Sequence, residues 1–395
     1  MSQIAGHVFL KSGRDKPVRG GNPWIFSQAI DRTKPATLAA GSMVEILDAS
    51  GALVAYGYYN AATTIALRVL SFGAALRCEE IVEYRIAHAI ELRQRFVAGE
   101  TNCCRLVNGD GDALSGVVID RYGDVLVVQL LTAGADRMRD EILAALVKLA
   151  HPRAIVERSQ GAVRKQEGLG DRTGLLLGEP VPEVIVVENG IRVAVDLEHG
   201  QKTGYFLDQR ENRALIPGLA TGARVLDAYC YAGGFALAAL KGGARRVVAV
   251  DTSARALSWA RRNLALNAYD EDGAEFVHGE APRYLAQNAG SFDLVVLDPP
   301  PLARGIKDVP HAAHLYVELN ALAMAALAPG GRLMTFSCSV HFGGEDFIRA
   351  VRIAQGKSRR NFRLLARLGA GPDHPVLLGH PEGEYLTGLL LADLS

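Results

Sequence analysis

The sequence predicts an α/β protein in which the C-terminal half forms a doubly wound sheet of the Rossmann type, preceded by a β-rich domain and a small α/β domain. Apolar strands and amphipathic helices alternate from residue 225 to the end of the chain, which predicts a parallel sheet with helices on both faces. Polar side chains also follow successive strands, where the carboxyl ends of such sheets bind ligands. These side chains are Asp227, Asp251, Glu280, Asp298 and Cys338.

Length and composition limit the possible classes of protein. At 395 residues the chain is long for one core, and we expect domains at residues 1–72, 75–180 and 184–395. Its 49% hydrophobic and 22% charged residues are typical of a soluble globular protein, and no apolar run approaches the ~18 residues of a membrane span. A net charge of zero means that nucleic acid would have to bind a local basic patch. The five cysteines include no C-x-x-C pair, so we expect no disulfide framework, no metal and a cytoplasmic location.

Residues 1–72 are predicted to be rich in strands, at 7–10, 43–48, 53–59 and 65–70. A basic cluster follows the first strand and precedes an aromatic residue. Cations for phosphates and a ring for stacking are what an RNA-contacting surface needs. The alternative is a solvated charged loop with the aromatic ring in the core. The candidate RNA-binding residues are Lys11, Arg14, Lys16, Arg19 and Trp24.

Residues 75–180 are predicted to form the second domain, with helices at 79–96 and 136–150 and strands around 116–131 and at 154–158. Four acids lie in its turns: Asp110, Asp112, Asp120 and Asp124. Their spacing matches no calcium-binding loop, and acids are common in turns, so we interpret them as structural.

A hairpin is predicted at 184–198, because strands at 184–188 and 191–196 flank Asn189-Gly190. The polar stretch 199–213 follows it and is predicted to close over a cofactor, because so many hydrogen-bonding side chains rarely cluster without partners. The alternative is a helix start capped by Asp208. The candidate residues are Gln201, Thr203, Gly204, Phe206, Asp208 and Arg210.

The stretch 225–235 reads V-L-D-A-Y-C-Y-A-G-G-F, a strand, a glycine loop and the start of a helix. Such a loop lets the backbone approach a ligand closely. Asp251, at the end of the next strand, is placed to bind a ribose, and Glu280 the edge of an adenine. The pyrophosphate fingerprint G-x-G-x-x-G is missing, which favours S-adenosylmethionine (SAM) over a dinucleotide. The alternative is an ordinary βαβ turn that contains a pair of glycines and binds no ligand. The cofactor candidates here are Asp227, Tyr231, Gly233, Asp251, Ser253, Glu280 and Asp298.

Two residues are candidates for catalysis. Asp298 precedes Pro299, Pro300 and Pro301, against which a planar substrate can lie while the carboxylate orients an amine or ring nitrogen. A thiolate at Cys338 can add to C6 of a pyrimidine, which makes C5 nucleophilic enough to accept a methyl group. The alternative for Cys338 is a small buried hydrophobic residue, the interpretation that we give to Cys230.

In combination, the motifs K-S-G-R-D-K-P-V-R-G-G-N-P-W, V-N-G-D-G-D, G-Q-K-T-G-Y-F-L-D-Q-R, L-D-A-Y-C-Y-A-G-G-F, D-P-P and F-S-C-S closely resemble the bacterial class I family that methylates C5 of a cytidine in 23S rRNA. The resemblance covers nearly the whole chain. It implies an N-terminal PUA domain, a central α/β domain, a Rossmann-like methyltransferase domain, SAM as methyl donor, 23S rRNA as partner and a homodimer. It also implies that Cys338 is the catalytic thiol and Asp298 the acid of D-P-P. Ala232, Glu280 and Pro301 depart from the family pattern.

Other functions stay open at this stage. The enzyme could methylate another atom or another RNA, with a structural Cys338. The chain could instead bind RNA and cofactor without turnover, as an assembly factor. A nicotinamide dehydrogenase is disfavoured by the missing G-x-G-x-x-G.

Overall fold

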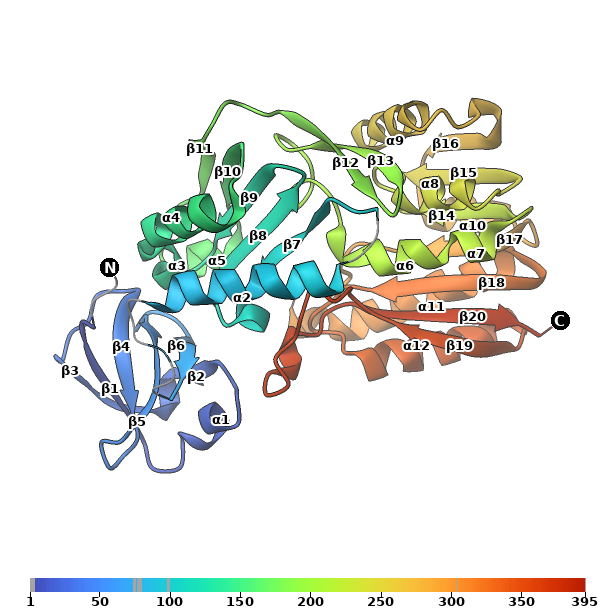
Figure 1. The fold of residues 1–395 in the computed structure, drawn as a ribbon. Coiled ribbons are helices and arrows are strands. Elements are labelled where there is room, and N and C mark those ends of the chain that lie inside the picture. Colours follow the sequence, from blue (N-terminus) through green and yellow to red (C-terminus); the bar gives the residue numbers. More distant parts are fainter. Residues whose placement is uncertain (1–3, 74–75, 77–79, 98–99, 304, 395) are drawn as a thin grey trace. The chain divides into compact units, whose positions relative to one another are not determined.

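The computed structural model describes residues 4–73, 76, 80–97, 100–303 and 305–394, and the chain divides into two compact units (Figure 1). Unit 1 comprises Met1–Val184, Asp196–Gly204 and Pro372–Gly383. Unit 2 comprises Ile185–Val195, Tyr205–Gly371 and Glu384–Ser395. The division into domains at 1–72, 75–180 and 184–395 stays a prediction.

Unit 1 begins with a six-stranded sheet in the order β2-β6-β5-β4-β1-β3. The four predicted strands are confirmed, and β2 and β3 are additional. β1 pairs with β4 in parallel, and the other pairs are antiparallel. The predicted basic loop contains the short helix α1 (Lys16–Arg19). The strands are β1 (Gly6–Leu10), β2 (Trp24–Phe26), β3 (Ile30–Lys34), β4 (Ser42–Leu47), β5 (Leu53–Tyr59) and β6 (Ile65–Phe72), and the 3-10 turn η1 is Ser27–Ala29.

A second sheet of unit 1 has five strands in the order β11-β10-β9-β8-β7. The helix expected at 136–150 is two helices that meet at Met138. The first of them starts before the predicted position, because the Thr132 hydroxyl accepts a hydrogen bond from the Ala135 N–H (3.4 Å) and caps it. The strands are β7 (Cys103–Asn108), β8 (Val117–Tyr122), β9 (Val125–Leu130), β10 (Ala154–Ser159) and β11 (Arg172–Leu177). The helices are α2 (Ile81–Phe96), α3 (Ala133–Arg137), α4 (Arg139–Ala150) and α5 (Ala162–Gln166), with η3 at Gly109–Asp112.

Three of the four turn acids of unit 1 form ion pairs, and the exposed Asp124 accepts from Arg153 (2.9 Å). Arg93 donates to Asp112 (2.6 Å), and Arg105 donates to Asp120 (2.8 Å). Within the described residues, no group of three or more His, Cys, Asp or Glu side chains is arranged to hold a metal ion. The pairing explains Asp112 and Asp120 as structural, since a buried carboxylate needs a cation or several donors.

Unit 2 is built on a seven-stranded sheet in the order β16-β15-β14-β17-β18-β20-β19. The first five strands are parallel, as predicted, but β20 is antiparallel to both β18 and β19. The expectation of a wholly parallel sheet is therefore wrong at one edge, where β20 turns back between two strands that precede it. The strands are β14 (Arg224–Ala228), β15 (Arg246–Asp251), β16 (Ala274–His278), β17 (Phe292–Leu297), β18 (Leu327–Ser337), β19 (Phe362–Leu368) and β20 (Thr387–Asp393).

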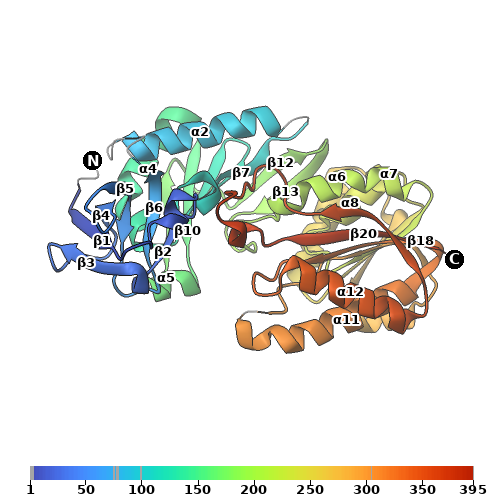
Figure 2. The same cartoon turned by 90° about the horizontal axis from the view of Figure 1, so that it is seen from below.

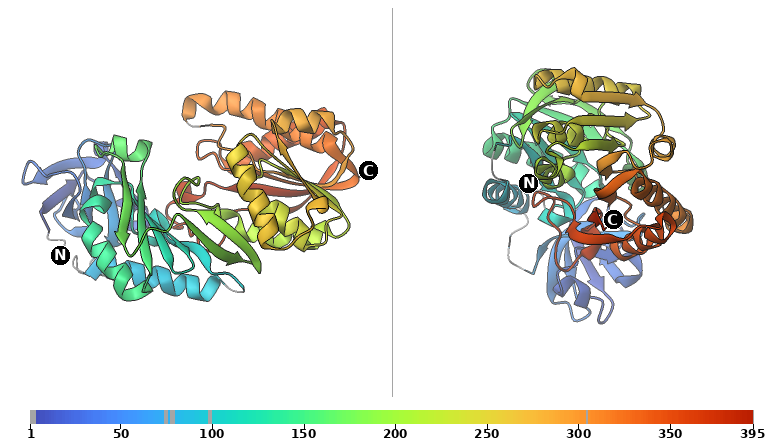
Figure 3. Two further views of the ribbon diagram at one scale, coloured as in Figure 1. Left: turned by 90° about the horizontal axis from the view of Figure 1, so that it is seen from above. Right: turned by 90° about the vertical axis from the view of Figure 1, so that its right-hand side faces the viewer.

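Helices cover both faces of this sheet (Figure 3). α8 (Gly234–Lys241) and α9 (Ala254–Leu266) pack on one face, and α10 (Ala281–Gln287), α11 (Val309–Ala326) and α12 (Gly344–Ser358) on the other. α11 and α12 lie side by side (Figure 2). α11 begins six residues before the predicted 315 because Pro310 lies in its first turn, where a missing N–H costs nothing.

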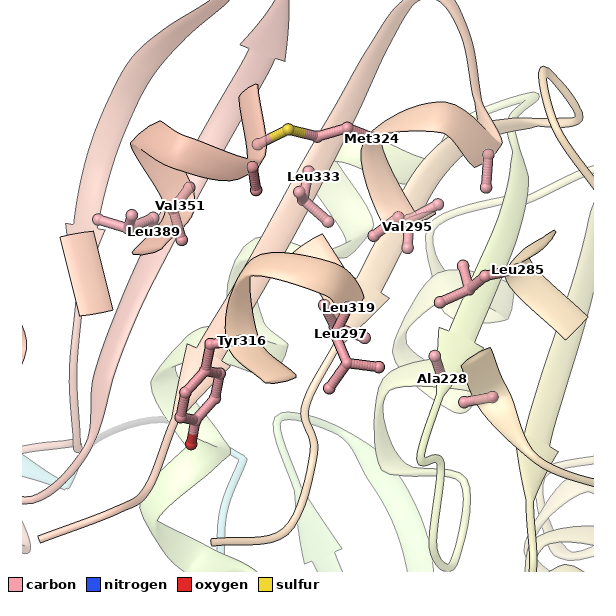
Figure 4. Close-up of a cluster of buried hydrophobic side chains, with 14 of the residues drawn as sticks. Ala228, Leu285, Val295, Leu297, Tyr316, Leu319, Met324, Leu333, Val351 and Leu389 are labelled. Carbon is pink, nitrogen blue, oxygen red and sulfur yellow. The ribbon is translucent and has the colours of Figure 1, made fainter. Parts of the chain in front are cut away.

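The core of unit 2 lies between the sheet and α10, α11 and α12 (Figure 4). Leu297 of β17, Leu333 of β18 and Leu389 of β20 meet Leu319 and Met324 of α11. Burial of these apolar side chains fixes the strands against one another, and so fixes the positions of the loops that follow them.

The remaining elements are short. The predicted hairpin is confirmed as β12 (Glu183–Glu188) and β13 (Ile191–Asp196), with Asn189 and Gly190 both at positive φ, as a two-residue turn of this type requires. None of the helices in the described residues is both long and apolar enough to cross a membrane. The other elements are α6 (Arg210–Leu215), α7 (Pro217–Ala220), η4 (Leu207–Gln209), η5 (Glu271–Gly273), η6 (Ile306–Asp308) and η7 (Pro381–Gly383).

Candidate active site

The strand order of unit 2 reverses between β14 and β17, which lie side by side in the middle of the sheet. Ligands of open α/β sheets bind outside the carboxyl ends of the strands at such a point. Asp227 lies at the end of β14 and Asp298 directly after β17. The Asp298 N–H donates to the Ala228 carbonyl (3.4 Å), so the two strand ends stay together as far as these acids.

Asp227 is the most buried of the strand-end acids, with 1% of its surface exposed. Its Oδ2 accepts a hydrogen bond from the Ala236 N–H in α8 (2.9 Å). Its Oδ1 is buried and has no hydrogen-bond partner among the described residues. Burial, together with the negative charges of Asp298 and Asp251, raises the pKa of Asp227 to about 7.

The glycine loop between β14 and α8 is held by packing. Tyr229, Tyr231 and Gly233 all have positive φ, which makes the loop sharply turned. A Cβ on Gly233 would lie 3.1 Å from the Ala260 Cβ, and one on Gly234 only 2.4 Å from the Tyr205 hydroxyl. Gly234 is therefore required by neighbouring side chains, and Gly233 is favoured by its positive φ. The close approach of this loop to a ligand stays a prediction.

Asp251 joins this loop to the next one. Its Oδ2 accepts from the Tyr231 N–H (2.9 Å) and its Oδ1 from the Ser253 N–H (2.8 Å). The Ser253 hydroxyl in turn caps α9 by accepting from the Ala256 N–H (3.2 Å). Each carboxylate oxygen has a second lone pair, which suits the two hydroxyls of a ribose.

Glu280 is the exposed N-cap residue of α10, one strand further along the sheet edge. Burial and then the charges of Glu280 and Asp251 raise the pKa of Tyr229 to about 12. Glu280 and Asp251 are therefore both close enough to the Tyr229 phenol for their charges to act on it.

Residues of the polar stretch 201–210 make many contacts with other protein residues. Residues 201–204 belong to unit 1 and residues 205–210 to unit 2. In unit 1 the Thr203 hydroxyl donates to Asp120 (2.5 Å) and contacts the Tyr122 hydroxyl (2.9 Å), and the Gly204 N–H donates to the Gln201 carbonyl (2.8 Å). The cofactor role of these residues stays a prediction.

In unit 2, Asp208 accepts from the Tyr385 hydroxyl (2.6 Å), and Arg210 pairs with Glu211 (3.2 Å). The Phe206 ring meets the Tyr231 ring edge to face at 5.2 Å. Asp208 lies inside η4, whose N-cap residue is Phe206, and the N-cap residue of α6 is Gln209. Asp208 is therefore not the residue that caps either helix, and the helix-cap alternative is wrong.

Arg213 is a buried residue of this site that the sequence reasoning missed. It makes a bidentate ion pair with Glu188 of the hairpin (2.6 and 2.7 Å) and lies over the Tyr205 ring. Burial alone would lower the pKa of Arg213, but the charge of Glu188 raises it, so the guanidinium stays charged. The only signal in the sequence that could have identified Arg213 as a site residue is its place in the polar stretch 199–213.

Cys338 follows β18, the strand next to β17. Its thiol is half-buried and donates to the Pro299 carbonyl (3.7 Å). Since Pro299 directly follows Asp298, the two candidate catalytic residues come from neighbouring strand ends. Cys230, by contrast, is buried, and burial raises the pKa of its thiol well above its usual range, which keeps it protonated.

The candidate RNA-binding residues of unit 1 differ in their surroundings. Lys11, Arg14 and Lys16 are exposed, although the Lys11 ammonium donates to the Gln28 carbonyl (2.9 Å). Arg19 is paired with Asp15 (2.6 Å) and Asp48 (3.1 Å). The Trp24 ring packs against the His380 ring at 4.3 Å, so the ring already has an aromatic neighbour within unit 1. These five roles stay predictions.

The fold and the residues at the strand ends define an SAM-dependent methyltransferase with an N-terminal PUA-like domain. Residues 112–377 match the family of S-adenosylmethionine-dependent methyltransferases, and residues 8–72 match PUA-like domains. The fold is also that of a Streptococcus mutans protein assigned as an SAM-dependent methyltransferase (22% identity, 99% of this chain and 100% of that chain, TM-score 0.82). A similar structure was solved in complex with S-adenosylhomocysteine (SAH; 21% identity, 99% and 100%, TM-score 0.84).

Bacterial relatives show more narrowly which methyltransferase family the chain belongs to. The chain is 40% identical to ribosomal RNA large subunit methyltransferase I of Tolumonas auensis over 97% of this chain and 98% of the relative. It is 39% identical to the enzyme of that name from Photobacterium profundum, over 96% and 98%. The chain belongs to the family of ribosomal RNA large subunit methyltransferase I.

The residues of unit 2 fit SAM, the methyl donor of this family. SAM carries positive charge on its sulfonium and amino groups. The mutual repulsion that raises the pKa of Asp227 is relieved by a cationic ligand, and its buried Oδ1 is an acceptor for an amino group. The carboxylate of Asp251 would suit the ribose hydroxyls, and its cofactor role stays a prediction. Bound there, SAM supplies an electrophilic methyl group.

Proposed function

We propose that this methyltransferase forms 5-methylcytidine in 23S rRNA, with Cys338 as a covalent nucleophile. The observation that carries the proposal is the contact of the Cys338 thiol with the Pro299 carbonyl (3.7 Å), immediately after Asp298. This contact supports a shared catalytic site, because Cys338 and Asp298 come from neighbouring strand ends close to the strand-order reversal. The names of the relatives support rRNA of the large subunit as the substrate.

Cysteine addition solves the chemical problem of cytosine, which is that C5 is a weak nucleophile. The Cys338 thiolate forms a bond to C6. The electron pair of the C5=C6 bond shifts to form a C4=C5 bond, and the pair of the C4=N3 bond moves to N3, which takes a proton. C5 then bonds to the methyl group while the methyl–sulfur bond breaks. A base removes the C5 proton, the C5=C6 bond re-forms as the thiolate leaves, and N3 gives back the proton that it took.

Other residues have supporting roles in this proposal. Asp298 holds the amine or ring nitrogen of cytosine, with the ring against Pro299 and Pro300. Asp227 meets the positive end of SAM, and Asp251 binds its ribose. In unit 2 the cofactor site is completed by Phe206, Asp208, Arg210, Tyr231, Gly233, Ser253 and Glu280. The cofactor roles of Gln201, Thr203 and Gly204, which belong to unit 1, stay predictions. The proposed RNA surface consists of Lys11, Arg14, Lys16, Arg19 and Trp24.

The proposal is tested by transfer of labelled methyl from SAM to 23S rRNA, with the modified base identified after digestion. The wild type, Cys338→Ala and Cys103→Ala are compared. Cys103 is a matched control because it is a buried cysteine of unit 1, far along the chain from the strand ends. Label on C5 of cytosine with the wild type and Cys103→Ala, and none with Cys338→Ala, is the expected result.

Two results would contradict the proposal. Full label on cytosine C5 with Cys338→Ala would remove the covalent step. Label on another atom would remove the cytosine-C5 assignment. The homodimer and the cytoplasmic location stay predictions.

A further inference from the structure

The hydroxyl of Tyr316 lies in the core of unit 2, next to the candidate catalytic cysteine. Tyr316 is on α11, and none of its surface is exposed (Figure 4). The Ser337 hydroxyl donates to the Tyr316 oxygen (2.9 Å), and the Tyr316 and Ser339 hydroxyls are 3.0 Å apart. Tyr316 therefore bonds to the residue before Cys338 and to the residue after it.

The same network reaches the loop that follows Asp298. The Ser339 hydroxyl accepts from the N–H groups of Leu302 (3.0 Å) and Ala303 (3.3 Å). The Ser339 N–H also approaches the Ser337 hydroxyl (3.4 Å). Three hydroxyls thus join the end of β18 to the proline loop, and the contact between the Cys338 thiol and the Pro299 carbonyl lies across this junction.

Aromatic packing fixes where the Tyr316 hydroxyl is. The Tyr316 ring stacks on the Phe342 ring at 5.0 Å and meets the Phe347 ring edge on at 5.3 Å. A side chain held on both sides has little rotamer freedom, so its hydroxyl is a rigid reference point.

Burial raises the pKa of Tyr316, an effect that the hydrogen bonds from Ser337 and Ser339 partly offset. The phenol therefore keeps its proton near neutral pH. It is suited to hold hydrogen bonds and is not suited to be the base that removes the C5 proton.

We propose that Tyr316 is a positioning residue of the methyl transfer: through Ser337 and Ser339 it sets the Cys338 thiol against the loop that carries Asp298. The inference rests on the proposed covalent role of Cys338. Addition to C6 needs the sulfur within about 3–3.5 Å of the carbon while the carboxylate side holds the base, and an error of about 1 Å can cost roughly 100-fold in rate. A hydrogen-bond network that connects both loops to one rigid ring prevents such a misplacement of the sulfur.

The test compares Tyr316→Phe, Ser339→Ala, the double variant and Thr335→Val. Tyr316→Phe keeps the stacked ring and removes only the hydroxyl. Thr335→Val is the matched control, because it removes another buried hydrogen bond between β18 and α11, from Thr335 to Asn320 (2.8 Å), away from Cys338. For each protein we would measure kcat, KM for rRNA, the thermal midpoint, and the rate of covalent adduct formation with RNA carrying 5-fluorocytidine at the target base.

Tyr316→Phe and Ser339→Ala should each lower kcat and the rate of adduct formation by roughly 10- to 100-fold, with KM for rRNA unchanged. The double variant should be no slower than the slower single variant, because both substitutions break one chain of hydrogen bonds. Thr335→Val should lower the thermal midpoint as the others do, yet keep the wild-type kcat.

The inference is overturned if Tyr316→Phe keeps the wild-type kcat and adduct rate. It is also overturned if Thr335→Val loses as much kcat, since the effect would then be general destabilisation. If the wild type itself forms no adduct while it methylates RNA, the proposed function fails first, and the inference fails with it.

Discussion

Because Asp227 ionises near neutral pH, the stability of the protein should fall as pH rises, whereas its affinity for SAM should increase. Its pKa rises from an ordinary 3.8 to about 7 in the folded chain, chiefly through burial. Below pH 3.8 both folded and unfolded states hold the proton, and no penalty applies. Between 3.8 and 7 the folded state holds the proton more tightly, so its stability falls as pH rises. Above pH 7 the full penalty is about 4 kcal/mol.

Asp227→Asn removes this titration and keeps the shape of the side chain. At pH 8 the ligand-free variant should be more stable than the wild type, with about 4 kcal/mol as an upper bound and a higher thermal midpoint. The variant should also bind SAM more weakly, because the negative charge that meets the cationic ligand is gone. A buried acid in a binding site lowers the stability of the protein in exchange for ligand binding, so its removal should raise stability and reduce function.

Wild-type affinity for SAM should fall by about tenfold for each pH unit below 7, because binding requires the ionised carboxylate. Isothermal titration calorimetry between pH 5.5 and 8 measures this directly. Asp227→Asn reports what the ionisation of the ligand itself contributes, and Asp272→Asn, an exposed acid of unit 2, should behave like the wild type. A wild-type affinity that changes with pH no more than that of Asp227→Asn, or a variant with unchanged stability at pH 8, would refute the reasoning.

Three further predictions concern packing, a buried ion pair and RNA affinity. Gly234→Ala should destabilise the protein by about 1–3 kcal/mol and lower its thermal midpoint, because the new Cβ would lie 2.4 Å from the Tyr205 hydroxyl; an unchanged midpoint would contradict the packing role. Arg213→Met should cost about 3–5 kcal/mol in chemical denaturation, since it leaves the Glu188 carboxylate buried without its cation, and a loss below about 1 kcal/mol would show that Glu188 finds other partners. Lys16→Ala should weaken rRNA binding and reduce the slope of log K against log salt by about 1 in filter-binding assays, whereas an unchanged slope would exclude Lys16 from phosphate contact.

The placement of the candidate cofactor acids at strand ends was predictable from the sequence because it depends on local patterns. An apolar strand followed by an acid, as at Asp227 and Asp251, needs only the alternation of strands and helices to place both acids on one sheet edge. The same logic brings Asp298 and Cys338 to adjacent strand ends. It could not tell which glycine serves packing, because the partner of Gly234 is Tyr205, on a separate segment.

Contacts between segments that lie far apart in the sequence were not predictable. β20 inserts between β18 and β19 in antiparallel fashion, and nothing in its apolar sequence distinguishes that direction. His380, near the end of the chain, packs on Trp24, which the sequence alone offered as a ring for stacking bases. Tyr316 lies within a helix whose apolar pattern marks it simply as core, and its hydroxyl acquires a role only when β18 is placed beside α11.

The claim that Cys338 attacks the cytosine ring can be tested most directly by trapping. Wild-type protein, SAM and an rRNA fragment with 5-fluorocytidine at the target position should form a stable covalent complex, because fluorine at C5 cannot leave as the proton does. The account predicts an adduct that mass spectrometry maps to Cys338. Efficient 5-methylation of ordinary RNA without any trapped adduct, or an adduct on another residue, would contradict it.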